Sequence, residues 1–156
     1  MIEAVVFDLG AVILFHKDKT NKEKLSPLYK KLKRQNNFQF EDYFVFNMKL
    51  LRFLEELKNK LDLFIFTSGT LHKAKEVRDV LAPIFLKIIT TEDIGAEKNE
   101  VNAYAKLATF IKKNPQEILY IDDMDVNVIN ARKAGFRAVV FENNDNLMKD
   151  IEKFLA

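Results

Sequence analysis

The most constraining feature of the sequence is an apolar run near its start that ends in a single acid. Residues 4–7 read Ala-Val-Val-Phe, Asp8 follows directly, and Gly10 lies two residues further on. A charge at the tip of a buried strand is costly unless it faces a cleft or a cation. A glycine so close behind it lets the backbone turn tightly or lie against a ligand. The same design recurs twice downstream.

Apolar runs alternate with amphipathic stretches along the remainder of the chain. After a first strand at 3–8, the sequence predicts the following further strands: 63–66, 84–90, 118–121 and 138–141. It predicts helices at these approximate ranges: 50–61, 71–83, 100–113, 126–134 and 146–156. Such alternation is typical of a doubly wound parallel sheet with helices on both faces. We therefore expect one Rossmann-like α/β domain of about five strands over residues 1–156, a length that suits a single core.

Residues 16–46 depart from this alternation. Between 16 and 37 the segment holds eight Lys or Arg residues against two acids, and residues 38–46 are rich in aromatic side chains. The spacing of its leucines predicts one short amphipathic helix that begins near Ser26 and Pro27. We interpret the segment as a small helical insertion over the first strand-helix connection. Its lysines, taken singly, indicate no more than a solvated face.

Composition excludes several classes of protein. The chain has no cysteine, which rules out disulfides and thiolate metal sites. A formal net charge of +2 gives no case for nucleic acid as a partner. No apolar run approaches the length of a membrane span, and the N-terminus lacks the pattern of a secretory leader. We expect a cytoplasmic protein without a membrane partner, and nothing in the sequence indicates an oligomeric state.

Polar side chains follow three of the predicted strands. Asp8 follows the first, Thr67-Ser68 the second and Asp122-Asp123 the fourth, while Lys98 lies in the loop after the third. Ligands of such sheets bind at the carboxyl ends of the strands, so these groups are expected to share one cleft. Clustered carboxylates repel one another unless a cation is present or a pKa rises. With oxygen ligands only, the expected cation is Mg²⁺.

Hydroxyl groups and a lysine beside such a metal site suit phosphate oxygens. Acids, cation and phosphate donors together indicate phosphoryl transfer, for which a carboxylate nucleophile is a known route. In their order and spacing, four segments resemble the motifs of the haloacid dehalogenase (HAD) superfamily of aspartate-nucleophile hydrolases. They are VVFDLGAV at 5–12, FIFTSG at 64–69, DIGAEK at 93–98 and ILYIDD at 118–123. The resemblance spans nearly the whole chain apart from the insertion, which would be a much reduced cap.

The resemblance implies a role for each acid. Asp8 would be the nucleophile and would also bind Mg²⁺. The carbonyl of Gly10 and the carboxylate of Asp122 would complete the protein side of the metal shell, and Asp123 would bind the metal directly or through water. The resemblance also implies that Lys98 neutralises charge on Asp8 and on the transferring group.

The remaining role concerns the phosphoryl oxygens. By the same resemblance, Thr67 and the amide of Ser68 would bind them, together with Lys98. The Asp-Leu-Gly form of the first motif resembles a branch regarded as phosphatases. We therefore expect a Mg²⁺-dependent phosphatase that hydrolyses a phosphomonoester through an aspartyl-phosphate on Asp8, with a substrate whose identity the sequence leaves open.

One departure from the family pattern bears on activity. Relatives with phosphatase activity usually have a second aspartate two residues after the nucleophile, where this chain has Gly10. General acid-base catalysis is worth about 10²–10⁴-fold in rate. His16 is a candidate substitute acid. The alternatives are a degenerate, non-catalytic HAD-fold module for binding or regulation, and a HAD hydrolase of another bond, such as a dehalogenase.

Overall fold

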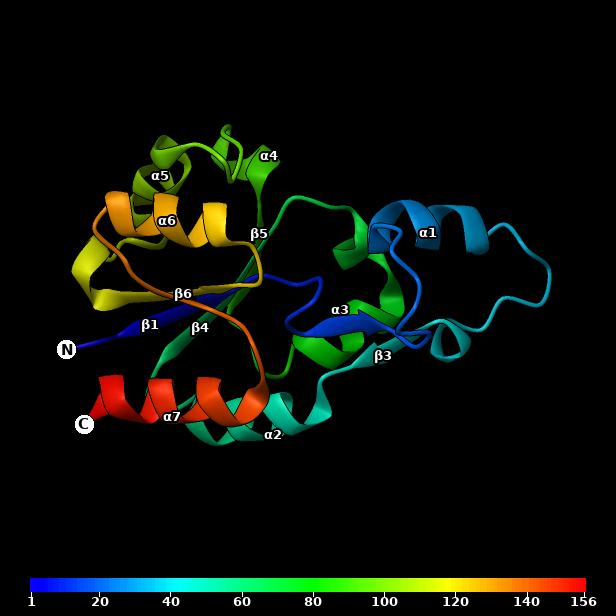
Figure 1. The fold of residues 1–156 in the computed structure, drawn as a ribbon, viewed down its shortest axis with the longest axis horizontal. Helices are drawn as coiled ribbons and strands as arrows, with labels where there is room; N and C mark the ends of the chain where they lie inside the picture. The colour runs from blue at the N-terminus through cyan, green and yellow to red at the C-terminus, as the bar shows by residue number, and fades with distance from the viewer.

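The chain folds around a five-stranded parallel sheet with helices on both faces, which confirms the expected fold class (Figure 1). The computed structural model describes residues 1–156. The strand order is β5-β4-β1-β6-β7, and each neighbouring pair is parallel. The strands of this sheet are β1 (Ala4–Phe7), β4 (Asp62–Thr67), β5 (Lys87–Thr90), β6 (Ile118–Asp122) and β7 (Arg137–Val140).

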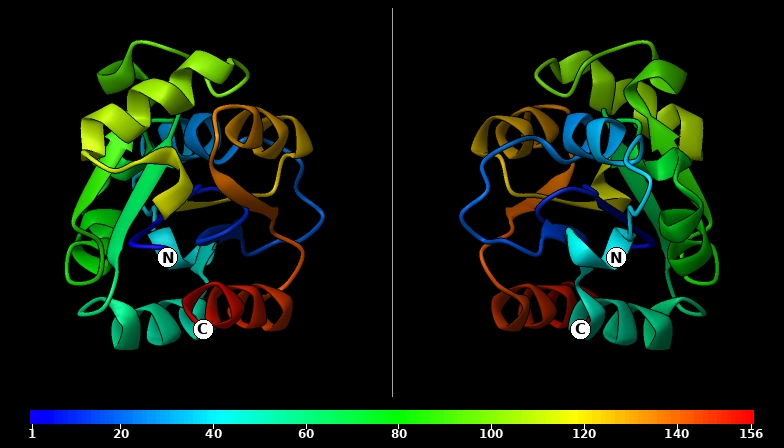
Figure 2. Two further views of the ribbon diagram at one scale, coloured as in Figure 1. Left: turned by 90° about the vertical axis from the view of Figure 1, so that its left-hand side faces the viewer. Right: turned by 90° about the vertical axis from the view of Figure 1, so that its right-hand side faces the viewer.

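Helices cover the sheet in two layers, with α5 and α6 on one face and α2 and α7 on the other (Figure 2). The α-helices are α1 (Leu25–Leu32), α2 (Met48–Leu57), α3 (Lys75–Leu81), α4 (Thr91–Ile94), α5 (Val101–Ile111), α6 (Asp125–Lys133) and α7 (Asn144–Leu155). Short 3₁₀ helices are η1 (Phe40–Asp42), η2 (Leu71–Lys73) and η3 (Pro115–Glu117). None of these helices combines the length and the apolar character needed to cross a membrane.

The central strand explains why its sequence is apolar at every position. Val5 and Phe7 belong to the core cluster shared with α2, α3 and α7, whereas Ala4 and Val6 belong to the cluster shared with α5 and α6. Successive side chains of a strand point to opposite faces, so a strand covered on both faces has no polar side. Each buried Val or Phe side chain contributes roughly 1.5–3 kcal/mol to folding.

The inserted segment leaves the sheet between β1 and α2. Its two ends pair as antiparallel strands, β2 (Leu14–His16) and β3 (Phe44–Phe46). The sequence did not predict these strands, because three residues are too few to show an alternating pattern. Aromatic rings pack together between them, with Tyr29 against Phe40 and Phe40 against Phe44. Helix α1 lies at the end of the molecule opposite the two termini, beyond the carboxyl end of β1 (Figure 1).

Several predicted boundaries were wrong, among them that of the helix expected at 50–61, which spans Met48–Leu57. The helix expected at 71–83 is divided into η2 and α3, because Ala74 has an extended backbone with ψ of 134°. The strand expected from residue 84 begins at Lys87, since Phe85 still belongs to the turn after α3 and packs on Phe7. The loop expected at 91–99 contains the helix α4, which Thr90 and Asp93 cap reciprocally.

Candidate active site

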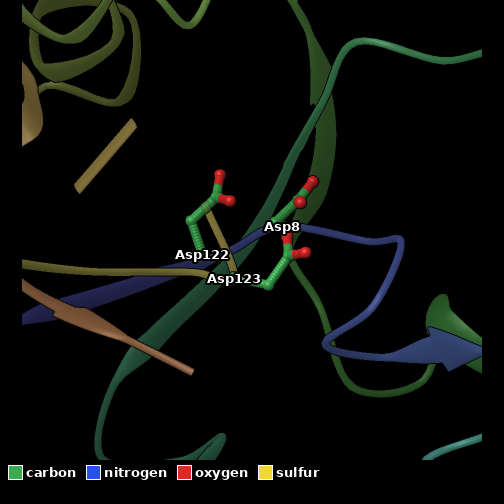
Figure 3. Close-up of side chains that lie close together, drawn as sticks. All are labelled: Asp8, Asp122 and Asp123. Carbon is green, nitrogen blue, oxygen red and sulfur yellow. The ribbon is translucent and has the colours of Figure 1, made fainter. Parts of the chain in front are cut away.

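The three acids predicted from the sequence meet at the carboxyl ends of β1 and β6. These strands are neighbours in register, Phe7 beside Ile121, and the amide of Asp8 donates to the carbonyl oxygen of Ile121 at 2.9 Å. Asp122 ends β6, and Asp123 follows it. Figure 3 shows the three carboxylates together, and one oxygen from each lies within 4.8 Å of the others. The structure thus brings together Asp8, Asp122 and Asp123.

Lys98 reaches this cluster from the loop after α4. Its Nζ lies 2.7 Å from Oδ1 of Asp8 and 3.4 Å from Oδ2 of Asp122. Only 7% of the residue is exposed, and the ammonium also lies 5.2 Å from the centre of the Phe66 ring. A buried lysine stays charged only where it is paired. Lys98 is therefore the internal counter-ion of the acid cluster.

Asp122 is completely buried and held at both oxygens. Its Oδ2 accepts hydrogen bonds from Oη of Tyr120 at 2.5 Å and from Nδ2 of Asn127 at 3.0 Å. Its Oδ1 accepts from the amide of Met124 at 2.9 Å. Such a set of donors fixes the carboxylate in one orientation and satisfies its charge.

Two buried tyrosines support these groups, and the sequence analysis missed both. Tyr120 donates to Asp122, and Oη of Tyr104 donates to the backbone carbonyl of Lys98 at 2.8 Å. Burial and the nearby Asp122 raise the pKa of Tyr120, so its phenol stays protonated as a donor. A usable signal existed for Tyr120: it lies two residues before Asp122 on one strand, so the two side chains share a face.

The acids carry more negative charge than Lys98 neutralises. Burial raises the pKa of Asp8, although the ammonium of Lys98 acts against this. Burial, followed by the charges of Asp8 and Asp122, raises the pKa of Asp123 to about 7. Three carboxylates and one lysine leave an excess of two negative charges when all are ionised. An arrangement of this kind is suited to a divalent cation.

The phosphate-binding candidates lie on the loop after β4, the other neighbour of β1. Thr67 is buried at the end of β4, and its Oγ1 accepts a long hydrogen bond of 3.4 Å from the amide of Gly69. Ser68 is exposed. No hydrogen bond joins either hydroxyl group to the acid cluster.

Gly10 and His16 lie further along the chain after β1. Gly10 is half-buried, and Cδ1 of Leu25 lies 3.3 Å from the position that a Cβ on Gly10 would take. His16 lies in β2, where its Nε2 is 2.6 Å from the carbonyl oxygen of Glu23. That contact occupies Nε2, whereas Nδ1 of the same ring is buried without a hydrogen-bond partner. The role of substitute acid considered for His16 from the sequence stays a prediction.

Comparison with known proteins agrees with the fold. A HAD family enzyme of Bacteroides thetaiotaomicron, solved with magnesium and inorganic phosphate, superposes with a TM-score of 0.70. It is 16% identical, and the match covers 94% of this chain and 99% of that one. The fold is therefore that of the HAD hydrolases. The model of the NLI interacting factor-like phosphatases matches residues 3–156, and the chain belongs to this family.

Two curated relatives share part of the chain. Enolase-phosphatase E1 of Caenorhabditis elegans is 31% identical over 98 residues, which are 58% of this chain and 39% of that protein. Enolase-phosphatase E1 of Methylococcus capsulatus is 32% identical over 82 residues, which are 49% of this chain and 35% of that protein. The matched part of the chain spans well under half the length of either relative.

Proposed function

We propose that this chain is a Mg²⁺-dependent phosphatase whose nucleophile is Asp8. The observation that carries the proposal is the state of this carboxylate. Its Oδ1 accepts hydrogen bonds from Lys98 and from the amide of Leu9, whereas Oδ2 receives no donor from the protein. A carboxylate with one oxygen fixed and the other without a donor has an oxygen available to attack phosphorus. The family match and the curated relatives, all named as phosphatases, support the same reaction.

The acid cluster fits a magnesium ion. It offers only oxygen ligands, from Asp8, Asp122 and Asp123, and the carbonyl of Gly10 is proposed as a fourth. Burial first, and then the neighbouring carboxylates, raise the pKa values of Asp8 and Asp123, so the protein alone disfavours their ionised forms. When bound, Mg²⁺ would offset the negative charge of the ionised acids and polarise the phosphoryl group.

The chain's own residues account for the two halves of the reaction. Oδ2 of Asp8 attacks phosphorus, and the ester P–O bond breaks as the leaving oxygen departs with the electron pair. Water then attacks phosphorus, breaks the P–O bond to Asp8 and releases inorganic phosphate. Lys98 offsets charge on Asp8 and on the phosphoryl group, while Thr67 and the amide of Ser68 bind the phosphoryl oxygens. With no side chain at Gly10, the leaving oxygen takes its proton from water.

Phosphate release from an aryl and an alkyl phosphomonoester tests this proposal. An aryl leaving group barely needs protonation, so it isolates the nucleophile and the metal from the missing acid. We expect turnover of the aryl ester with Mg²⁺, none with a chelator, and none in Asp8→Asn. Failure of the wild type on both esters would contradict the proposal. It would favour a non-catalytic module, a role for which Leu25 packed over Gly10 is the supporting observation.

A further inference from the structure

The first turn of α1 lies against both loops of the proposed site. Oγ of Ser26 accepts hydrogen bonds from the backbone amides of Thr70 at 3.1 Å and Leu71 at 3.2 Å. The neighbouring residue, Leu25, packs over Gly10. One turn of the inserted segment therefore contacts the loop after β4 and the loop after β1 together.

Gly69 leaves the space that the side chain of Ser26 occupies. A Cβ placed on Gly69 would lie 2.3 Å from Oγ and 3.2 Å from Cβ of Ser26. The first of these distances is well below any non-bonded contact, so a side chain at 69 and the hydroxyl of Ser26 cannot occupy their present places together. The serine on α1 and the glycine in the loop form one interlocking contact.

The two hydrogen bonds from Thr70 and Leu71 to Ser26 also give an acceptor to backbone amides at the start of η2. The amide of Leu71 opens η2, and the first amides of a helical turn have no partner within it. Thr70, the residue before η2, makes no side-chain cap. Ser26 supplies the missing acceptor from 44 and 45 residues away. No other hydrogen bond joins residues 17–43 to the loops that follow the sheet strands.

We propose that Ser26 is a positioning residue for phosphate binding, a role that rests on the proposed function of this site. It holds the loop from Thr67 to Leu71 in the conformation in which Thr67 and the amide of Ser68 meet the phosphoryl oxygens. The loop's own link, from Gly69 to Thr67, is the longest of these hydrogen bonds at 3.4 Å. The inserted segment thus acts on the reaction through one hydroxyl group.

The test is a double-mutant cycle of Ser26→Ala, Gly69→Ala and the pair, read by calorimetric binding of inorganic phosphate in saturating Mg²⁺. Loss of one acceptor from two amides should raise the phosphate Kd of Ser26→Ala by about fivefold. Gly69→Ala should raise the phosphate Kd by more than Ser26→Ala does. The pair should fall short of the product of the two effects, because the alanine at 69 no longer meets Oγ.

Two further readouts separate positioning from general loss of structure. In Ser26→Ala the Kd for Mg²⁺ should stay within about twofold of the wild-type value. The proposed ligands of Mg²⁺ lie outside the loop from Thr67 to Leu71 that Ser26 holds. With an aryl phosphate, KM should rise more than kcat falls. Lys30→Ala, an exposed change on the same helix, serves as the matched control and should alter neither Kd.

The proposal is overturned by an unchanged phosphate Kd in Ser26→Ala, by equal losses of phosphate and Mg²⁺ binding, or by multiplicative effects in the cycle. A wild type that binds no phosphate also overturns it. Phosphate binding without turnover of any ester would overturn the proposed function alone, since the Kd cycle still measures the contact. Turnover with an unchanged Kd in Ser26→Ala would overturn this inference alone.

Discussion

The two sides of the proposed site are held in place by different means. The acid side, formed by Asp8, Lys98, Asp122 and Asp123, rests on the ends of central strands and on buried hydrogen-bond donors. The loop side, from Thr67 to Leu71, is tied by the hydroxyl group of Ser26 on an inserted helix. The acid side is therefore preorganised by the core, whereas the loop side depends on a segment outside the sheet.

In the proposed reaction, metal binding and nucleophilic attack thus belong to the acid side, and phosphate binding belongs to the loop side. The residues proposed to bind metal lie at a largely buried site, where electrostatic interactions are strong. The residues proposed to bind the phosphoryl oxygens lie on a loop in which Ser68 and Thr70 are exposed. Substitutions on the acid side should act on metal binding and chemistry, and those on the loop side on phosphate affinity.

The largest expected effect comes from Asp8→Asn. Removal of the nucleophile should lower kcat with an aryl phosphate by about 10³–10⁶-fold. The thermal midpoint should not fall, because the amide removes a buried charge whose pKa is already raised. Release of phosphate and thermal unfolding, measured on one preparation, check both points. A variant that retains a tenth of the activity would exclude Asp8 as the nucleophile.

Tyr120→Phe tests whether the core orients the metal ligands. Loss of the phenol removes one donor to Asp122, and loss of such an outer partner typically weakens metal binding by about 10–100-fold. Titration of Mg²⁺ by calorimetry measures the change. Tyr104→Phe is the matched control, because that phenol donates to the backbone of Lys98 and not to an acid. Equal effects of both variants would contradict the argument.

Thr67→Val tests the loop side with a change of nearly equal volume. The hydroxyl group lies at the carboxyl end of β4 and makes only a long internal hydrogen bond, so the free energy of unfolding should change little. Phosphate binding should weaken by about tenfold, as expected for one lost hydrogen bond to a charged group. Phosphate and Mg²⁺ affinities should therefore separate, with the Mg²⁺ Kd close to that of the wild type. Equal losses of phosphate and Mg²⁺ affinity would contradict the proposed division between the acid side and the loop side.

The smallest expected effect concerns pH. The pKa of Asp123, ordinarily 3.8, is raised to about 7 in the folded chain, so folding favours its protonated form. Stability of the metal-free protein should therefore fall as the pH rises from about 4 through 7, the direction set by linkage. Asp123 is partly exposed, so we discount the effect to about 1 kcal/mol, or 2–4 °C in the thermal midpoint.

Saturating Mg²⁺ should flatten this pH dependence, because the cation favours the ionised acids. Asp123→Asn provides the control and should weaken the pH dependence without metal, leaving the part that comes from Asp8, whose pKa is also raised. Thermal unfolding in a chelator between pH 5 and 8 is the measurement. His72, whose pKa burial lowers, acts in the opposite direction over this range, so the contribution of Asp123 is the difference between the wild type and Asp123→Asn. Identical pH profiles of the two proteins would contradict the prediction.

The sequence was sufficient to predict the sheet and the acid side. A strand buried on both faces is apolar at every position, so Ala4–Phe7 and Ile118–Ile121 stand out, and each is followed by an acid. Parallel pairing then places Asp8 and Asp122 at one edge. Lys98 was predicted by family resemblance, and its geometry agrees with a counter-ion. The roles assigned to these residues stay predictions until they are measured.

The loop side and the insertion were harder to predict for physical reasons. Strands β2 and β3 have three residues each and pair across a long excursion of the chain. The contact of Ser26 with Gly69 joins residues 43 positions apart, and neither a serine nor a glycine indicates by its type which residue it contacts. Ala74 breaks a helix although alanine favours helices, so tertiary packing overrides local preference there.

The packing of Leu25 over Gly10 makes the amino acids at these two positions interdependent. Even a methyl group at position 10 would lie 3.3 Å from Leu25, and a carboxylate side chain needs further room. An aspartate at position 10 therefore requires the end of the Leu25 side chain to shift by a few tenths of an ångström. A smaller residue at position 25 would remove that requirement, so substitutions at the two positions should not be additive. Engineering of an internal acid into this chain is thus coupled to α1, which lies outside the motif.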